Sequence, residues 1–412
     1  MQSAGQREDA AADAYDDDVD SDAPVPNADQ LVAECVTLAA KQIDTDPQLC
    51  ELVAQYWRLV PHEEMAGRSA PTLLAATISH RELAGQRVQG ELKMRVALAP
   101  DQSHTAIEIV TDDMPFLVDS VTAALTARTL DTHLLVHPLF VVSREALGKL
   151  REIHLDREPE QAEGNQLVES WMRIEVDPIR SADDRLALHN DLVRVLTDVR
   201  ETVEDWPKMR QQALGLADEL ASAQLPVPDK DITDSIELLR WLVDGHFTFL
   251  GYREYRLGRN AEGELLLEAQ LGTGLGILRG DQPHGRVLSS MSPEAYAKAL
   301  EKRLLIITKA NSRATVHRAA YLDYIGFKVF DPAGEVIGER RFLGLFSSAA
   351  YRTSVRELPV VRRKVAEVLD RSGLSPRSHS GKDLMEILET YPRDELFQIA
   401  TDELYRSVTR VV

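Results

Sequence analysis

The chain has 412 residues, enough for two or three domains that each bury a core of their own. A hydrophobic content of 44% and a charged content of 28% are ordinary for folded proteins and argue against wholesale disorder. The formal net charge of −20 disfavours nucleic acid and anionic membranes as partners, because both require clustered positive charge on the protein.

The lengths of the apolar runs and the number of cysteines indicate where the protein is located and whether it has disulfides or a zinc site. No apolar run approaches the roughly 20 residues that span a bilayer, and the N-terminus lacks a signal pattern, so we expect a cytoplasmic protein. The two cysteines, Cys35 and Cys50, are too few for a disulfide framework or a zinc site. We therefore expect no metal in this chain.

The N-terminal part is predicted to be a tail followed by helices. Residues 8–22 hold eight carboxylates and no basic group, so residues 1–29 are predicted to be a disordered acidic tail. Residues 30–90 are predicted to be N-terminal helices, interrupted at Asp46-Pro47.

Residues 91–206 have the pattern of a two-layer α+β sandwich, with a pair of helices on an antiparallel sheet. In the strand predicted at 170–177, apolar Met172 and Ile174 alternate with Arg173 and Glu175, which predicts one buried and one solvated face. A capping pattern at Ser181 then begins an amphipathic helix. The other expected elements are strands at 91–101, 104–111 and 132–143 and a helix from Leu117.

The second half is predicted to be another mixed α+β module. A helical linker at 207–230 leads to a module at 231–373, with strands at 246–257 and 263–270 and flanking helices. In the hairpin expected at 325–347, Asp331-Pro332-Ala333-Gly334 has the composition of a type I turn. Residues 374–412 are predicted to be a helical connector toward a downstream domain that this chain lacks.

Several motifs suggest chemistry but lack a required residue. The glycines of LGTGLGILRG (271–280) do not fit the dinucleotide fingerprint, because Ile277 stands at the third position. HEEMA (62–66) has Ala66 where a metalloprotease helix needs a second histidine. We identify no catalytic, cofactor-binding or metal-binding residue in this chain.

A turn between a strand and a helix is the first candidate site. It consists of Asp113, Met114, Pro115, Phe116 and Leu117. The aspartate can cap the helix, the proline suits its first turn, and the free N–H groups at a helix start attract anions. The alternative is a capped helix in a packing module, without a ligand.

A basic segment in an acidic protein is the second candidate. It contains Lys309, Arg313, His317 and Arg318. These residues either form a solvated face that pairs with the protein's own carboxylates, or contact an anion or another subunit.

Many segments, in order along the chain, resemble the N-terminal part of the large bacterial NAD-specific glutamate dehydrogenases. They include DDMPFLVDSV, HPLFVVSR, ESWMRIEVD, LLRWLVDGHFTFLGYREY, ITKANSRATVHR, GERRFLGLFSSAAY and YPRDELFQIA. The family converts L-glutamate, NAD⁺ and water to 2-oxoglutarate, ammonium and NADH, and its catalytic residues lie far downstream of the region matched. The resemblance thus implies a non-catalytic segment of an NAD-dependent enzyme, inactive alone.

The same resemblance implies an ACT-like, ferredoxin-like fold for residues 91–206 and a PAS-like fold for residues 231–373. Many ACT domains bind an amino acid at an Asp-x-Pro-Gly-Leu turn, and here Phe116 replaces the glycine. The implied role is subunit contact in a homo-oligomer and allosteric sensing of an amino-acid effector, beside a downstream catalytic domain. The alternative is a free-standing ACT/PAS-type sensing or scaffolding protein.

Overall fold

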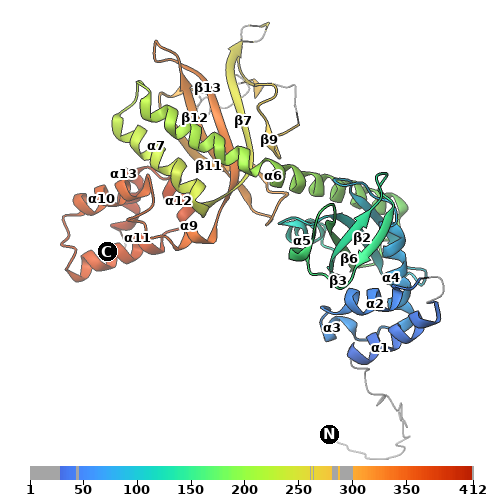
Figure 1. Cartoon of the computed structure of the whole chain (residues 1–412). Coiled ribbons are helices and arrows are strands. Elements are labelled where there is room, and N and C mark those ends of the chain that lie inside the picture. The colour runs from blue at the N-terminus through green and yellow to red at the C-terminus, as the bar shows by residue number, and fades with distance from the viewer. Residues whose placement is uncertain are drawn as a thin grey trace, which may run out of the picture.

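The computed structural model describes residues 28–42, 46–259, 261–262, 264–280, 286–287 and 300–410. The predicted acidic tail lies outside these ranges except at its end, where Ala28 and Asp29 begin a helix. Two lobes, each built on an antiparallel sheet, are joined by one long helix (Figure 1). None of the helices in the described ranges combines the length and apolar character needed to cross a membrane.

The N-terminal helices form the outer part of the first lobe. His80 shows how tightly they pack on the sheet: its ring lies 5.4 Å from that of Trp171, and it hydrogen bonds to the Tyr56 hydroxyl (2.8 Å) and the Ile109 carbonyl (3.1 Å). Burial lowers the pKa of His80 to about 4. The helices are α1 Ala28–Ala39, η1 Ala40–Gln42, α2 Leu49–Trp57, α3 His62–Met65 and α4 Ala70–Ala84.

The sheet of the first lobe has the strand order β1-β2-β6-β4-β5, with β3 also paired to β6, and its strand pairs are antiparallel. The predicted strand at 132–143 is two strands, interrupted at His137-Pro138 because proline has no N–H for a ladder. The strands are β1 Lys93–Leu98, β2 Thr105–Asp112, β3 Thr132–Val136, β4 Leu139–Arg144, β5 Leu150–His154 and β6 Leu167–Val176, and helix α5 is Leu117–Ala127.

The face of β6 that carries charges is not solvated, contrary to the sequence-based prediction. Arg173 is 7% exposed and Glu175 is 2% exposed, because the N-terminal helices add a third layer to the predicted two-layer sandwich. Arg173 forms ion pairs with Glu108 (2.6 Å) and Glu175 (2.8 Å). On the same strand, Glu169 accepts hydrogen bonds from Arg87 and Arg144. Buried charges of this kind need such partners.

Helix α6 (Ala182–Ser222) belongs to both lobes. The Ser181 hydroxyl caps it by accepting from the Asp184 amide (3.2 Å), as its sequence predicts. The helix continues through Pro207, although proline removes one N–H, because both halves are buried. Its first half contributes Leu188, Leu192, Leu196 and Val199 to the core with α5, and its second half contributes Met209, Ala213, Leu216 and Leu220 to the core of the second lobe.

The second lobe is a mixed α+β module, as predicted. Its sheet has the order β10-β8-β7-β13-β12-β11, with β9 on β7. The hairpin turn has the expected form, since the Gly334 amide donates to the Asp331 carbonyl (2.9 Å). The elements are α7 Asp229–Trp241, η3 Leu242–His246, β7 Phe247–Arg259, β8 Leu265–Ala269, β9 Leu275–Gly276, β10 Arg286–Val287, β11 Leu305–Arg313, β12 Tyr321–Phe330 and β13 Val336–Phe346.

Short helices complete the second lobe and share its core. The Lys364 ammonium donates to the Leu396, Phe397 and Ile399 carbonyls (2.8–3.0 Å) and so ties two of them together. The helices are α9 Ser348–Arg352, α10 Val361–Ser372, α11 His379–Thr390, α12 Arg393–Gln398 and α13 Thr401–Val408.

Candidate functional site

The candidate turn connects β2 to α5. The Asp113 amide donates to the Val168 carbonyl (3.0 Å), so residue 113 still takes part in the pairing of β2 with β6. The residue that caps α5 is Phe116, and no side chain caps the helix there. The prediction that Asp113 caps α5 is therefore wrong, because this residue lies three positions too early.

Phe116 adopts the backbone conformation in which related turns place glycine. Its φ is +73°, in the left-handed region that side chains other than glycine rarely occupy. Packing compensates for this cost, since the Phe116 ring lies 5.1 Å from the His317 ring. The substitution therefore keeps the geometry of the turn while adding an aromatic surface.

His317 brings the two candidate regions together, although it is 197 positions from Ser120 in the sequence. Its amide donates to the Ser120 hydroxyl (2.9 Å), and its Nδ1 lies 3.1 Å from the Asp119 carboxylate. His317 itself has a φ of +71°. The start of α5 is therefore a contact between the lobes as well as a turn.

A cavity of about 300 Å³ lies beside the turn. Pro115 and Phe116 form one wall of it. The remaining walls come from α6 and the start of β7, namely Thr202, Val203, Trp206, Phe247 and Thr248. This lining is largely apolar, with two threonine hydroxyls.

Asp113 is the one turn residue with an ionisable side chain. Partial burial raises the pKa of its carboxyl, and the nearby His137 opposes this shift. Burial lowers the pKa of His137, whose Nε2 lies 2.7 Å from the Ser170 hydroxyl. Asp113 is not among the residues that line the cavity, and a raised carboxyl pKa arises from structural contacts as well as at functional sites.

The other basic candidates interact mostly within the chain. Lys309 forms ion pairs with Asp323 (2.6 Å) and Asp394 (2.9 Å). Arg318 donates to the Phe346 carbonyl (3.0 Å). Arg313 is exposed, and its guanidinium lies 5.2 Å from the centre of the Tyr321 ring. Of the four, Arg313 retains the most freedom to contact another molecule.

The glycine-rich loop at 271–280 is tied to α6. The Asp205 carboxylate accepts hydrogen bonds from the Gly276 amide (3.0 Å) and from Arg279 (2.8 Å). Within the described ranges, no cluster of three or more histidine, cysteine or acidic side chains could hold a metal ion.

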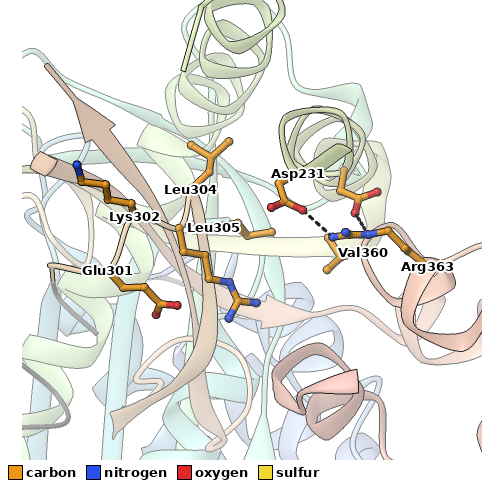
Figure 2. A pocket seen from close by; sticks show the side chains of 9 residues that line it. Asp231, Glu301, Lys302, Leu304, Leu305, Val360 and Arg363 are labelled. Atoms are coloured by element: carbon orange, nitrogen blue, oxygen red, sulfur yellow. Dashed lines mark hydrogen bonds and ion pairs between the residues drawn. The ribbon is translucent and has the colours of Figure 1, made fainter. Parts of the chain in front are cut away.

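A second cavity, of about 400 Å³, was not predicted from the sequence (Figure 2). It lies between α7, residues 301–305 and the start of α10, where Arg363 pairs with Asp231 (2.9 Å) and Asp234 (2.7 Å). The spacing of Asp231 and Asp234, three apart on one helix, was the available signal, but it does not reveal the partner 132 positions away.

Val360, in the wall of this second cavity, has a strained backbone. Its φ is +69° and its ψ is −50°, and the Val361 amide donates to the Pro359 carbonyl (2.7 Å), which makes a γ-turn. A β-branched residue with positive φ is a true outlier, and such strain clusters at functional sites.

Two family models match the chain. The model described as the ACT1 domain of glutamate dehydrogenase matches residues 52–192, and the model described as helical motif 1 of glutamate dehydrogenase matches residues 358–412. The first range includes α3 and α4 together with the sheet, α5 and the start of α6. The ACT identity of the first lobe is thereby confirmed.

Curated relatives extend the match to most of the chain. NAD-specific glutamate dehydrogenase of Halomonas elongata is 36% identical over 383 residues, or 90% of this chain. The protein of the same name from Pseudomonas aeruginosa is 36% identical over 89% of this chain, and that from Mycobacterium tuberculosis is 31% identical over 83%. The aligned part is 23%, 23% and 20% of these relatives, so the chain spans less than a quarter of their length. The chain thus belongs to the NAD-specific glutamate dehydrogenase family and corresponds to part of the length of these relatives.

Proposed function

We propose that this chain is the regulatory and oligomerisation segment of an NAD-dependent glutamate dehydrogenase. The enzyme would convert L-glutamate, NAD⁺ and water to 2-oxoglutarate, ammonium and NADH through a catalytic domain that this chain does not contain. The observation that carries the proposal is the match over nine tenths of the chain to relatives of which the aligned part is less than a quarter.

The proposal requires that residues 1–412 alone do not oxidise glutamate. The test is to incubate the purified chain with L-glutamate and NAD⁺ and to follow NADH absorbance. We expect no NADH above the rate of a protein-free control, and sustained NADH formation would disprove this part of the proposal. The full-length relative from Pseudomonas aeruginosa is the positive control.

The regulatory part of the proposal concerns the turn at 113–117. An amino-acid effector would bind at this turn, in the cavity that Pro115 and Phe116 border, and would act on the second lobe through the contact between Phe116 and His317. The support is the position of this turn, which contacts both lobes. The second lobe would be a PAS-like module, and both lobes would contribute contacts in a cytoplasmic homo-oligomer.

Thermal unfolding against a panel of amino acids tests this role. A ligand at 100 times its dissociation constant adds about 2.7 kcal/mol to the stability of the native state. We expect one amino acid to stabilise the parent and Asp113→Ala to lose that response. If only Phe116→Gly responds, the phenylalanine has closed the site and the module is architectural.

A free-standing sensing or scaffolding protein is the alternative. Reading the gene beyond the codon for Val412 separates the two: continuation into a nucleotide-binding domain supports the enzyme segment, and a stop codon supports the alternative.

A further inference from the structure

The cavity between α7, residues 301–305 and α10 has walls of opposite charge. Asp231 and Asp234 carry two negative charges, and the single guanidinium of Arg363 between them leaves this wall with a net charge of −1. Figure 2 shows Asp231 and Arg363 on one side of the space and Glu301 and Lys302 across from them. A ligand in this cavity would therefore face the net negative charge of this wall.

The opposite wall supplies a free guanidinium. Lys302 is neutralised by its ion pair with Glu335 (2.6 Å). The negative charge of Glu301 favours the charged form of Lys328. Arg303 is exposed, and its side chain forms no hydrogen bond or ion pair with any described residue. This arginine is thus available for a carboxylate, which it can bind through two parallel N–H groups.

The arginines of both walls also act on Lys364, a partly buried neighbour. Burial, together with the neighbouring Arg303 and Arg363, lowers the pKa of its ammonium to about 8. Leu304, which is buried, and Leu305 lie between the charged walls and provide an apolar floor.

We propose that this cavity binds a free α-amino acid. Its ammonium group would contact the carboxylates of Asp231 and Asp234, its carboxylate would contact Arg303, and its side chain would lie over Leu304 and Leu305. A volume of about 400 Å³ is within the range of small-molecule sites. The site is separate from the turn at 113–117 and does not depend on the enzyme assignment.

The location gives the site a structural role. Val360, which lines it, is held in a strained γ-turn near the start of the region matched by helical motif 1. A ligand that spans α7, residues 301–305 and α10 would fix these three elements relative to one another.

The test is binding of the twenty L-amino acids to the full 412-residue chain, measured by titration calorimetry, with the N-acetyl and carboxamide derivatives of the tightest binder. We expect one amino acid to bind and both derivatives, which lack one charge each, to bind at least about tenfold more weakly. Equal binding of the N-acetyl derivative or of acetate would overturn the proposal. Neither has an ammonium group, so the carboxylates of Asp231 and Asp234 would then contribute nothing to binding. Absence of binding by all twenty would also overturn it.

Variants locate the site. Arg303→Gln removes no contact within the described residues, so it should fold normally and bind at least about tenfold more weakly. Asp231→Asn should also weaken binding, because the ammonium group of the ligand would lose one of its two carboxylate partners. Arg151→Gln, at an exposed arginine of the first lobe, should leave the affinity unchanged. Binding that survives Arg303→Gln but is lost in Asp113→Ala would place the amino acid at the turn and overturn this proposal without affecting the enzyme assignment.

Discussion

The two sheets bury their faces with different chemistry. Beneath the N-terminal helices, the first sheet carries ion-paired side chains such as Glu169 and Arg173, which must keep their partners to remain buried. The face of the second sheet toward α6 and α7 carries aromatic rings packed edge to face, among them Phe249 and Phe342 (5.8 Å). The first packing combines these ion pairs with apolar contacts such as those of Trp171, whereas the second relies on apolar area.

The largest expected effect tests the aromatic side of this comparison. Phe342 is fully buried and lies within 6.2 Å of the rings of Phe249, Tyr252 and Phe327. Phe342→Ala should lower the free energy of unfolding by about 3–5 kcal/mol, measured by urea denaturation. Ile337→Ala, at an exposed position of the same strand, should change it by less than about 0.5 kcal/mol. Similar losses in both variants would show that the rings are not the main source of stability.

The charged side is tested at Glu169. Glu169→Gln removes the negative charge between buried Arg87 and Arg144 while keeping the size of the side chain. We expect a loss of about 3 kcal/mol in the free energy of unfolding, because the Arg144 guanidinium loses its counter-charge and that of Arg87 keeps only Asp112. Glu163→Gln, in an exposed pair with Arg157, should cost nearly nothing. An unchanged Glu169→Gln variant would mean that the carboxylate is dispensable.

A pH-dependent effect is expected where α6 meets the second lobe. Burial alone would raise the pKa of Asp205, but hydrogen bonds from Arg279, the Gly276 amide and Lys208 outweigh it and hold the pKa at about 2. Because the folded pKa lies below the unfolded value, the carboxylate stabilises the protein above about pH 4, and this contribution is lost as the pH falls toward 2.

Asp205→Asn should therefore be about 2 kcal/mol less stable than the parent at pH 7, and this difference should shrink below about pH 4. Urea denaturation at several pH values measures it, with Asp218→Asn at an exposed position as the control. A difference that stays constant down to pH 3 would contradict the assigned pKa.

The smallest effect is expected at the start of α6, in the first lobe. Ser181→Ala removes the hydroxyl that accepts from the Asp184 amide, and should cost about 1 kcal/mol in thermal unfolding. Ser222→Ala, at the other end of the helix, where the hydroxyl caps no amide, should cost less. Equal costs would show that capping does not matter in a helix held by two cores.

Features that depend on residues close together in the sequence, such as helices and turns, were predicted correctly. The apolar spacing from Leu188 to Val199 and the turn at Asp331–Gly334 both appear as expected. The failure at Arg173 and Glu175 has a clear cause: alternation marks which side chains share a face, but not whether helices from earlier in the chain cover that face. Strand β5 was missed because its charged sequence is stabilised mainly by pairing with β4.

The candidate site was predictable only in part. The turn at 113–117 could be found because it follows a strand and precedes a helix. Its contact with His317, and the approach of Arg363 to Asp231, depend on how distant segments pack, for which a single sequence contains no signal.

Helix α6 has a mechanical consequence. At 41 residues it extends roughly 60 Å, and each half is fixed in a different core. A tilt of about 5° at one end therefore displaces the other end by roughly 5 Å, the distance of a full helical turn. A small change of orientation near one sheet therefore becomes a movement of several ångströms near the other.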